Sequence, residues 1–247
     1  MWDDPRQLNA LSLVLASAAF VALAWAGVAW LVRQTWFDFR EVAVVTPLAH
    51  ASAPHLEAAI RGDLKGTFFT LDLRQAQDAL RNVPWVRSVA LRRQWPRRLT
   101  VEIEEQVPFA RWNDSALVNT HGEVFLADWN GDLPRFDGPE GRSDVMTQRY
   151  QSWSATLATL GLTIRALRLS ARGGWEIDAE GPHGPLTVEV GRDEADARLA
   201  RFVAAYARTV EAVERAGTRV DQVDLRYRNG FAARAPDLHE TTARKPS

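Results

Sequence analysis

The sequence contains no cysteine, and this absence excludes several kinds of chemistry at once. Disulfides, thiol nucleophiles and zinc sites built on cysteine all require that side chain. Lysine is almost as rare, because only Lys65 and Lys245 occur and nearly every cation is an arginine. The formal net charge is −1 and the sequence pI is about 6.5, so the chain lacks the basic field that nucleic-acid binders carry. We therefore expect no nucleic-acid partner.

Catalytic motifs are missing as well. The sequence has no G-x-S-x-G, no phosphate-binding loop and no G-x-G-x-x-G. The histidines are scattered along the chain, at His50, His55, His121, His183 and His239. None of them pairs with a carboxylate at metal-ligand spacing on one face. The glutamates of residues 102–105 fit a solvated strand face better than a pair of catalytic acids. We therefore predict no enzyme activity, no metal, no cofactor and no small-molecule substrate.

One long stretch has no charged residue at all. Residues 8–32, LNALSLVLASAAFVALAWAGVAWLV, would span about 37 Å as a helix, which is enough for a bilayer core of about 30 Å. A cleaved signal peptide ending near residues 24–26 is the alternative, but its apolar region would be about half as long. We predict a retained membrane helix over residues 9–32. Arg6 mildly favours a cytoplasmic N-terminus by the positive-inside rule, although Arg33 and Arg40 on the other side weaken that signal.

Four arginines surround a Trp-Pro pair in the segment LRRQWPRRL, residues 91–99. Such a cluster is typical of a patch for nucleic acid or anionic lipid, or of the exposed end of a hairpin. The stretch that follows alternates, with Leu99, Val101 and Ile103 on one side, and this pattern predicts a strand with one buried face. Proline fits the turn before that strand, because it has no N–H for a ladder. We interpret the cluster as a solvated hairpin end, preceded by a strand that carries a bulge.

The part after the apolar stretch begins with a β-α-α-β-β pattern. A strand candidate spans residues 37–45, a helix candidate spans residues 52–61, and a second helix candidate follows Asp72. Ser52 and Asp72 are of the residue types that cap helices. With the two strands of the hairpin, the pattern predicts two helices on one face of a three-stranded sheet. The fold class is therefore α+β.

The rest of the chain is rich in strand signals. A hairpin is predicted over residues 116–128, a helix over residues 145–160 and three strands over residues 162–191. A long helix follows, which Asp193 is expected to cap, because apolar residues recur at helical spacing beyond it. The segment VDQVDLRY, residues 220–227, predicts a strand with Val223, Leu225 and Tyr227 on one face. Asn229 and Gly230 then predict a two-residue turn.

These observations suggest five parts. They are a tail (1–8), a membrane helix (9–32), a first α+β domain (37–106), a second β-rich domain (107–236) with a long helix near its C-terminus, and a polar tail that we expect to be disordered (237–247).

The motifs in this layout resemble those of the FtsQ/DivIB family of bacterial cell division proteins. The resemblance rests on the block PWV…QWP…L-x-V-x-I…ARW, residues 84–112, together with the late V-D-L-R-Y. It implies a POTRA domain followed by a β domain, both in the periplasm, and one span in the inner membrane. It also implies a non-enzymatic scaffold at the division septum. Such a scaffold binds FtsB and FtsL and links early to late division proteins.

The resemblance further implies a partner-binding site. In the family, the last strand of the β domain takes up a strand of FtsB by edge addition, and unpaired strand edges invite such pairing. The residues that match the family's site are Arg172, Arg226, Tyr227, Asn229, Gly230 and Arg234. Arg172 matches an arginine that meets an acidic residue of the partner. Arg234 stands near a position where the family often has an aromatic, and Phe231 lies earlier.

Two other classes of function remain open from the sequence. One is an envelope assembly or secretion factor that uses its POTRA-like module to add strands. Such factors are expected to carry several modules or a barrel, and this chain has one module and no barrel pattern. The other is an envelope enzyme without a recognisable motif.

Overall fold

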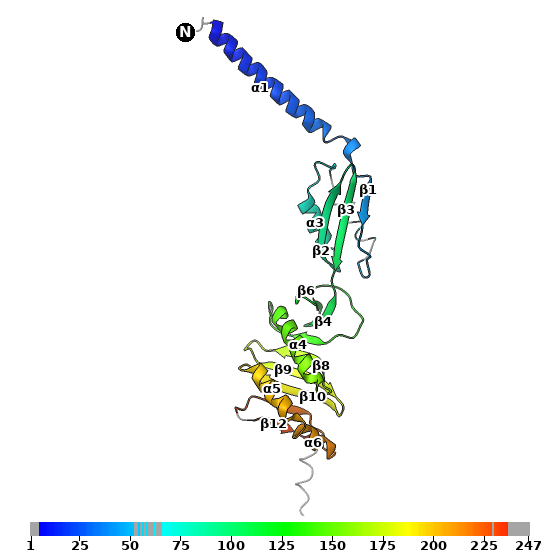
Figure 1. Ribbon diagram of the computed structural model, residues 1–247, viewed down its shortest axis with the longest axis vertical. Helices are drawn as coiled ribbons and strands as arrows, with labels where there is room; N and C mark the ends of the chain where they lie inside the picture. The colour runs from blue at the N-terminus through cyan, green and yellow to red at the C-terminus, as the bar shows by residue number, and fades with distance from the viewer. Residues whose placement is uncertain are drawn as a thin grey trace, which may run out of the picture. The chain divides into compact units, whose positions relative to one another are not determined.

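The computed structural model describes residues 5–51, 54, 56, 58, 62, 66–228 and 230–236. The chain divides into two compact units, Met1–Gln106 and Val107–Ser247 (Figure 1). The first unit begins with α1 (Pro5–Leu31), whose side chains are exposed from residue 9 almost throughout. Within it, Asn9–Leu31 is long and apolar enough to cross a membrane by length and composition. A short 3₁₀ helix, η1 (Thr35–Phe37), follows.

The first unit continues with a small sheet and a helix. Its strands are β1 (Glu41–Val44), β2 (Val86–Gln94) and β3 (Arg98–Glu105), and its helix is α3 (Leu73–Arg81). In the described residues the strand order is β1-β3-β2, with β1 parallel to β3. The carboxylate of Asp72 accepts hydrogen bonds from the first turn of α3, as a helix cap does. Of the helix predicted over residues 52–61, Pro54, Leu56 and Ala58 are helical, and the others, with the expected cap Ser52, lie outside the described residues.

The β2–β3 hairpin confirms the interpretation of the arginine-rich segment. The register runs from Val86 opposite Glu105 to Gln94 opposite Arg98, so the Trp-Pro pair lies at the turn. The predicted bulge is present between Val86 and Ser88. Leu99, Val101 and Ile103 are buried and face the core of this unit.

Glu105, at the far end of the same hairpin, holds a loop in place. Its carboxylate accepts backbone N–H groups from Ala49 at 3.0 Å, His50 at 3.1 Å and Ala51 at 2.7 Å. Burial raises the pKa of Glu105, but these three donors outweigh it and leave the pKa below its ordinary value. The carboxylate therefore ties β3 to a segment more than fifty residues earlier.

The second unit is built on one large sheet. Within the described residues, nine strands follow the order β12-β11-β10-β9-β8-β7-β4-β5-β6. They are β4 (Pro108–Trp112), β5 (Ala116–Asn119), β6 (Val124–Phe125), β7 (Arg135–Asp137), β8 (Thr163–Leu169), β9 (Trp175–Gly181), β10 (Gly184–Gly191), β11 (Gln222–Asp224) and β12 (Ala232–Arg234). The predicted hairpin over residues 116–128 and the three strands over residues 162–191 are confirmed.

Within the described residues, helices cover one face of this sheet and none covers the other. Helix α4 (Ser143–Ala158) packs against β8, and α5 (Ala195–Tyr206) packs against β10 (Figure 1). Along β9, Trp175, Ile177 and Ala179 are buried in the same core as the helices, while Glu176 and Asp178 alternate with them. Successive side chains of a strand point to opposite faces, so the two acids lie on the helix-free face.

The predicted long helix is wrong in detail, because it is interrupted. Helix α5 ends at Tyr206, and α6 (Val210–Arg215) begins after a break. At the break, the Thr209 hydroxyl donates a hydrogen bond to the Ala205 carbonyl at 2.8 Å, and the Thr209 backbone is not helical. Asp193 is not the cap either. That position is taken by Glu194, whose φ of 51° lies in the left-handed region.

The predicted strand over residues 220–227 is also longer than the observed one. Strand β11 ends at Asp224, whose carboxylate accepts the Arg226 N–H at 2.9 Å, so the chain turns away from the ladder. Tyr227 is consequently 58% exposed and does not share the buried face of Val223. Of the expected two-residue turn, Asn229 lies outside the described residues. Asp224 pairs with Ala232, so residues 225–231 separate β11 from β12.

Candidate functional site

The C-terminal strand β12 forms one edge of the large sheet. It pairs with β11 on one side, and no described strand pairs with its other side. All three of its residues are exposed. An edge of this kind presents unpaired backbone N–H and C=O groups, to which another strand can add. The binding segment expected at residues 226–230 is therefore the loop that leads into the edge, and the edge itself is Ala232–Arg234.

Arg226 lies just beyond β11 and is held by two carboxylates of its own chain. Its guanidinium donates to Asp224 through Nε at 2.8 Å and through Nη2 at 2.7 Å, and Nη2 also lies 2.8 Å from Glu189. The hydrogen bond to Asp224 is the main cause of a raised pKa for Arg226, and the same bond lowers the pKa of Asp224. The Arg226 side chain is 59% exposed, so its outer edge can still meet a partner.

The two acids that hold Arg226 belong to a row of charged side chains across the helix-free face. The register aligns Asp137, Arg168, Glu176, Glu189 and Asp224 on five adjacent strands, from β7 to β11. Residues that stand opposite one another on neighbouring strands point to the same face. The row therefore runs toward the exposed edge and ends beside Ala232 of β12.

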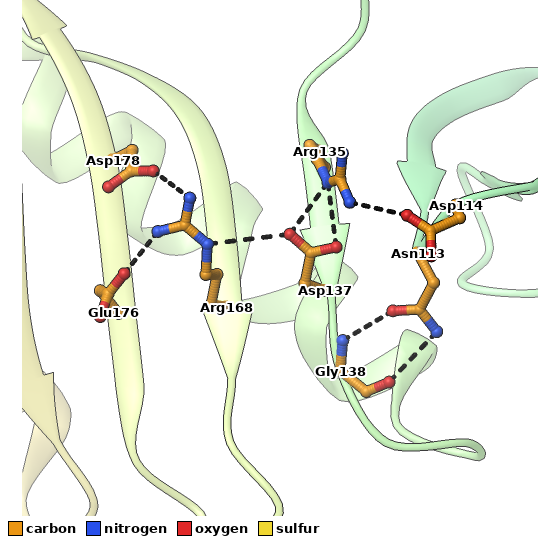
Figure 2. Close-up of polar contacts among 8 residues, drawn as sticks. All are labelled: Asn113, Asp114, Arg135, Asp137, Gly138, Arg168, Glu176 and Asp178. Carbon is orange, nitrogen blue, oxygen red and sulfur yellow. Dashed lines mark hydrogen bonds and ion pairs between the residues drawn. The ribbon is translucent and has the colours of Figure 1, made fainter.

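Arg168 is the hub of this row. Its guanidinium contacts Asp137 from one side and Glu176 and Asp178 from the other (Figure 2). Burial lowers the pKa of Arg168, but the hydrogen bonds to Asp178 and Glu176 outweigh it and leave the pKa raised. Arg135 continues the network from Asp137 to Asp114 (Figure 2). These contacts join three strands, β7, β8 and β9, and the turn between β4 and β5 into one charged surface.

Two adjoining hollows lie along this end of the sheet. The larger has a volume of about 590 Å³ and is lined by Asp137, Arg168, Glu189 and Arg226, among others. The second, of about 580 Å³, shares the β8–β9 turn and Trp175 with the first. The turn between β8 and β9 therefore separates the two hollows.

Arg172 lies at the tip of that turn and lines the second hollow. The turn is closed by the Ser170 N–H, which donates to the Gly174 carbonyl at 2.8 Å. Arg142 and Arg192 line the same hollow, so three arginines gather around an apolar floor that includes Trp175. Arg172 is exposed and makes no ion pair with any described residue, so its charge is available to an acidic partner.

The other expected site residues are placed differently. Gly230 lies with Phe231 at a smaller hollow of about 170 Å³ beside α5. There the Phe231 ring packs on Phe202 with centroids 5.5 Å apart, which ties the loop to the core. Arg234 is on β12 itself and is exposed, whereas Asn229 lies outside the described residues. Arg172, Arg226 and Arg234 thus sit on three different segments of the second unit.

The sequence alone does not indicate this row of charged side chains. Its members alternate with buried residues along short strands, which marks a solvated face but does not say which strands are neighbours. Only the sheet order brings Asp137 next to Arg168 and Glu189 next to Asp224. Among the described residues, no three histidine, aspartate or glutamate side chains are grouped so that they could hold a metal ion.

Comparison with known proteins agrees with this architecture. A family model for the C-terminal part of the cell division protein FtsQ/DivIB matches residues 110–226, and one for the FtsQ-type POTRA domain matches residues 37–106. The chain is 36% identical to the cell division protein FtsQ of Burkholderia pseudomallei, over 98% of this chain and 97% of the relative. The chain belongs to the FtsQ/DivIB family.

Other members of the FtsQ/DivIB family match over similar lengths. Identity is 37% to the FtsQ of Bordetella pertussis, over 94% of this chain and 92% of the relative. It is 32% to that of Neisseria gonorrhoeae, over 96% of both chains. Family membership confirms the resemblance, the α+β class with a POTRA domain, and a role in cell division.

Proposed function

We propose that this chain is a non-enzymatic scaffold of the divisome that binds FtsB and FtsL and so links early to late division proteins. Helix α1 anchors it in the inner membrane with a cytoplasmic N-terminus, and both folded units lie in the periplasm at the septum. A strand of FtsB adds to the free edge of β12. The observation that carries this proposal is the exposed edge strand at the end of a nine-stranded sheet.

The edge supplies affinity through the backbone, and the arginines supply selectivity. Each added main-chain hydrogen bond contributes about 1 kcal/mol net, which is modest but repeated along the strand. Arg172 and Arg234 are exposed and have no ion pair within the part of the chain that the structure describes. Acidic side chains of the partner can pair with them without first displacing an internal carboxylate.

Arg226 has a different role in this scheme. Two internal carboxylates already hold it, so it positions the loop before β12 and offers only its exposed outer edge to the partner. Charge reversal by Arg226→Glu would place a third carboxylate beside Asp224 and Glu189. That variant would disturb the loop as well as the interface, so it cannot serve alone as a test of the partner contact.

The edge itself provides a sharper test. Proline cannot donate to a ladder, so Ala233→Pro in β12 blocks strand addition, and Val124→Pro places the same change in β6 at the opposite edge. Loss of one or two hydrogen bonds of about 1 kcal/mol each corresponds to binding weakened roughly five- to thirtyfold. We expect Ala233→Pro to show this loss and Val124→Pro to bind as the parent does. The measurement is titration of the full chain, in nanodiscs, with the periplasmic part of FtsB.

Arg172→Ala is a second test of the site, and it leaves the residues of β12 unchanged. It removes an exposed cation that has no ion pair with any described residue, so circular dichroism should stay unchanged while FtsB binding weakens severalfold. Equal binding by the parent, Ala233→Pro and Arg172→Ala would reject the site. Equal losses from Ala233→Pro and Val124→Pro would reject the choice of edge.

A further inference from the structure

The turn of the β2–β3 hairpin lies against the residues that directly follow the membrane helix. The Arg97 guanidinium donates through Nε to the Asp38 carbonyl at 3.1 Å, and Arg40 donates its N–H to the Arg97 carbonyl at 3.0 Å. The Thr67 hydroxyl donates to the Val32 carbonyl at 2.7 Å, next to the last residue of α1. Three segments that are distant in sequence therefore meet at this end of the first unit.

Exposed aromatic rings gather at the same end. Trp36 is 75% exposed, Trp95 is 69% exposed and Phe69 is 49% exposed. Phe69 packs on Phe37 with ring centroids 5.1 Å apart, and Trp95 packs on Phe68 at 5.8 Å. We call the aromatic rings of these five residues the aromatic tip. Large apolar side chains exposed together in this way mark an interaction surface rather than a random surface feature.

The aromatic tip is close to the membrane whatever the direction of α1. Phe37 follows Leu31, the end of α1, by six residues, and an extended chain covers at most about 3.6 Å per residue. The Phe69 ring packs on Phe37 and on Phe68, and Trp95 packs on Phe68, which also donates its N–H to the Phe37 carbonyl at 2.7 Å. Trp36 directly precedes Phe37 in the chain. Tryptophan and other aromatic rings favour the interface between the membrane and water.

Positive charge surrounds the aromatic tip. Residues 33–40 and 93–97 together contain four arginines, Arg33, Arg40, Arg93 and Arg97, and one acid, Asp38. Arg33 and Arg40 are exposed and have no ion pair with any described residue. Arginine presents several donors in a fork that fits phosphate oxygens, so the surplus charge complements anionic phospholipid headgroups.

We propose that the aromatic tip inserts at the interface of the membrane that α1 spans, with Arg33 and Arg40 on anionic phospholipid headgroups. The POTRA domain then contacts the membrane itself, in addition to the anchorage by α1. The solvated hairpin end expected from the sequence is exposed as predicted, but it faces lipid headgroups. This inference rests on the anchorage by α1 included in the proposed function and needs no partner protein.

The absence of cysteine allows a direct test with single labelling sites. Gln94→Cys places an environment-sensitive fluorophore beside Trp95 and keeps the aromatic tip intact. Ala49→Cys is the matched control. Ala49 is exposed in the same domain, but its N–H bonds to Glu105 at the opposite end of β3. The Glu105 end of β3 lies about 25 Å from the hairpin turn beside position 94, by the usual rise per residue of a strand.

The full chain carrying either label is placed in nanodiscs that contain nitroxide-labelled lipid. We expect the nitroxide to quench the fluorophore at position 94 and to leave the emission of the fluorophore at position 49 unchanged. The loss at position 94 should be larger with anionic than with zwitterionic lipid, and Arg33→Gln with Arg40→Gln should remove that difference. Trp95→Ser with Phe69→Ser, both at exposed positions, should restore the emission at position 94.

Each contrary result rejects a specific part of the proposal. Full emission at position 94, or equal quenching at positions 94 and 49, rejects insertion of the aromatic tip. Quenching that ignores lipid charge rejects the role of the arginines. A chain that elutes apart from the discs rejects the anchorage and this inference together. A chain that enters the discs and keeps full emission at position 94 rejects this inference alone.

Discussion

Replacement of Arg168 by methionine should destabilise the second unit, because Arg168 is the hub of the charged row. Within the described residues, the variant leaves Glu176 and Asp178 without a cation, whereas Asp137 keeps Arg135. A hydrogen bond to a charged group contributes about 1.5–3 kcal/mol, but exposed ion pairs contribute only about 0.2–1 kcal/mol. The Arg168 side chain is 43% exposed, so its contacts must be discounted for solvent screening. We expect the free energy of unfolding to fall by about 2 kcal/mol.

Arg165→Met is the matched control on the same strand. Among the described residues, Arg165 makes one exposed ion pair, 3.3 Å from Asp132. Its loss should therefore change the free energy of unfolding by no more than about 0.5 kcal/mol. The assay is urea unfolding of the full chain in mild detergent, monitored by hydrogen exchange of amides in β8 and β9. This signal reports the second unit separately from α1 and the first unit.

Salt gives an independent check on the same reasoning. Partly exposed charges are screened as ionic strength rises, so the difference between Arg168→Met and the parent should shrink in 1 M salt, where the Debye length is about 3 Å. Equal effects of Arg168→Met and Arg165→Met would refute the hub. A more stable Arg168→Met would show that desolvation of the guanidinium outweighs its contacts.

Two further predictions concern single contacts. Glu105→Gln should destabilise the first unit by about 1–3 kcal/mol at neutral pH. Since the pKa of Glu105 lies below its ordinary 4.5 in the folded state, its contribution is present above that pH and is lost as the pH falls further, so parent and variant should converge in acid melts. Gly122→Ala should cost more than Gly217→Ala, which itself costs about 1 kcal/mol. Both have positive φ, but only at position 122 would a Cβ meet backbone, 2.6 Å from the Asp144 Cα. Equal unfolding free energies of the two variants would contradict this.

Local patterns were sufficient where the structure depends on neighbours in sequence. The alternation of Leu99, Val101 and Ile103 predicted the β2–β3 hairpin, and the bulge was predicted from a slipped apolar spacing before it. These signals are strong because each strand buries one face, so a slip of one residue would expose the whole apolar set. The same reasoning predicted the three strands over residues 162–191.

Local patterns failed where one side chain competes with the backbone. The apolar stripe beyond Asp193 continues through the break at Thr209, whose hydroxyl bonds to a carbonyl of the preceding turn. The apolar alternation of VDQVDLRY likewise continues past Asp224, although that carboxylate turns the chain out of the ladder. Both residues are of types whose side chains offer the backbone an alternative partner.

The candidate site was predictable only in part. The resemblance pointed to Arg172 and Arg226, but the sequence did not indicate that Arg226 is held by its own carboxylates while Arg172 is not. That difference depends on strands β10 and β11 being parallel neighbours, with Glu189 opposite Asp224. Their pairing brings together residues more than thirty positions apart, which no local pattern encodes.

Hydrogen exchange at the two edges of the large sheet tests the central claim most directly. The full chain in nanodiscs is compared with and without the periplasmic part of FtsB, and amide exchange is measured in β12 and in β6. Strand addition would slow exchange in residues 232–234 and leave residues 124–125 unchanged, because only the β12 edge gains hydrogen bonds. Saturating FtsB that leaves β12 exchange unchanged, or that protects β6 instead, would contradict binding at the C-terminal edge.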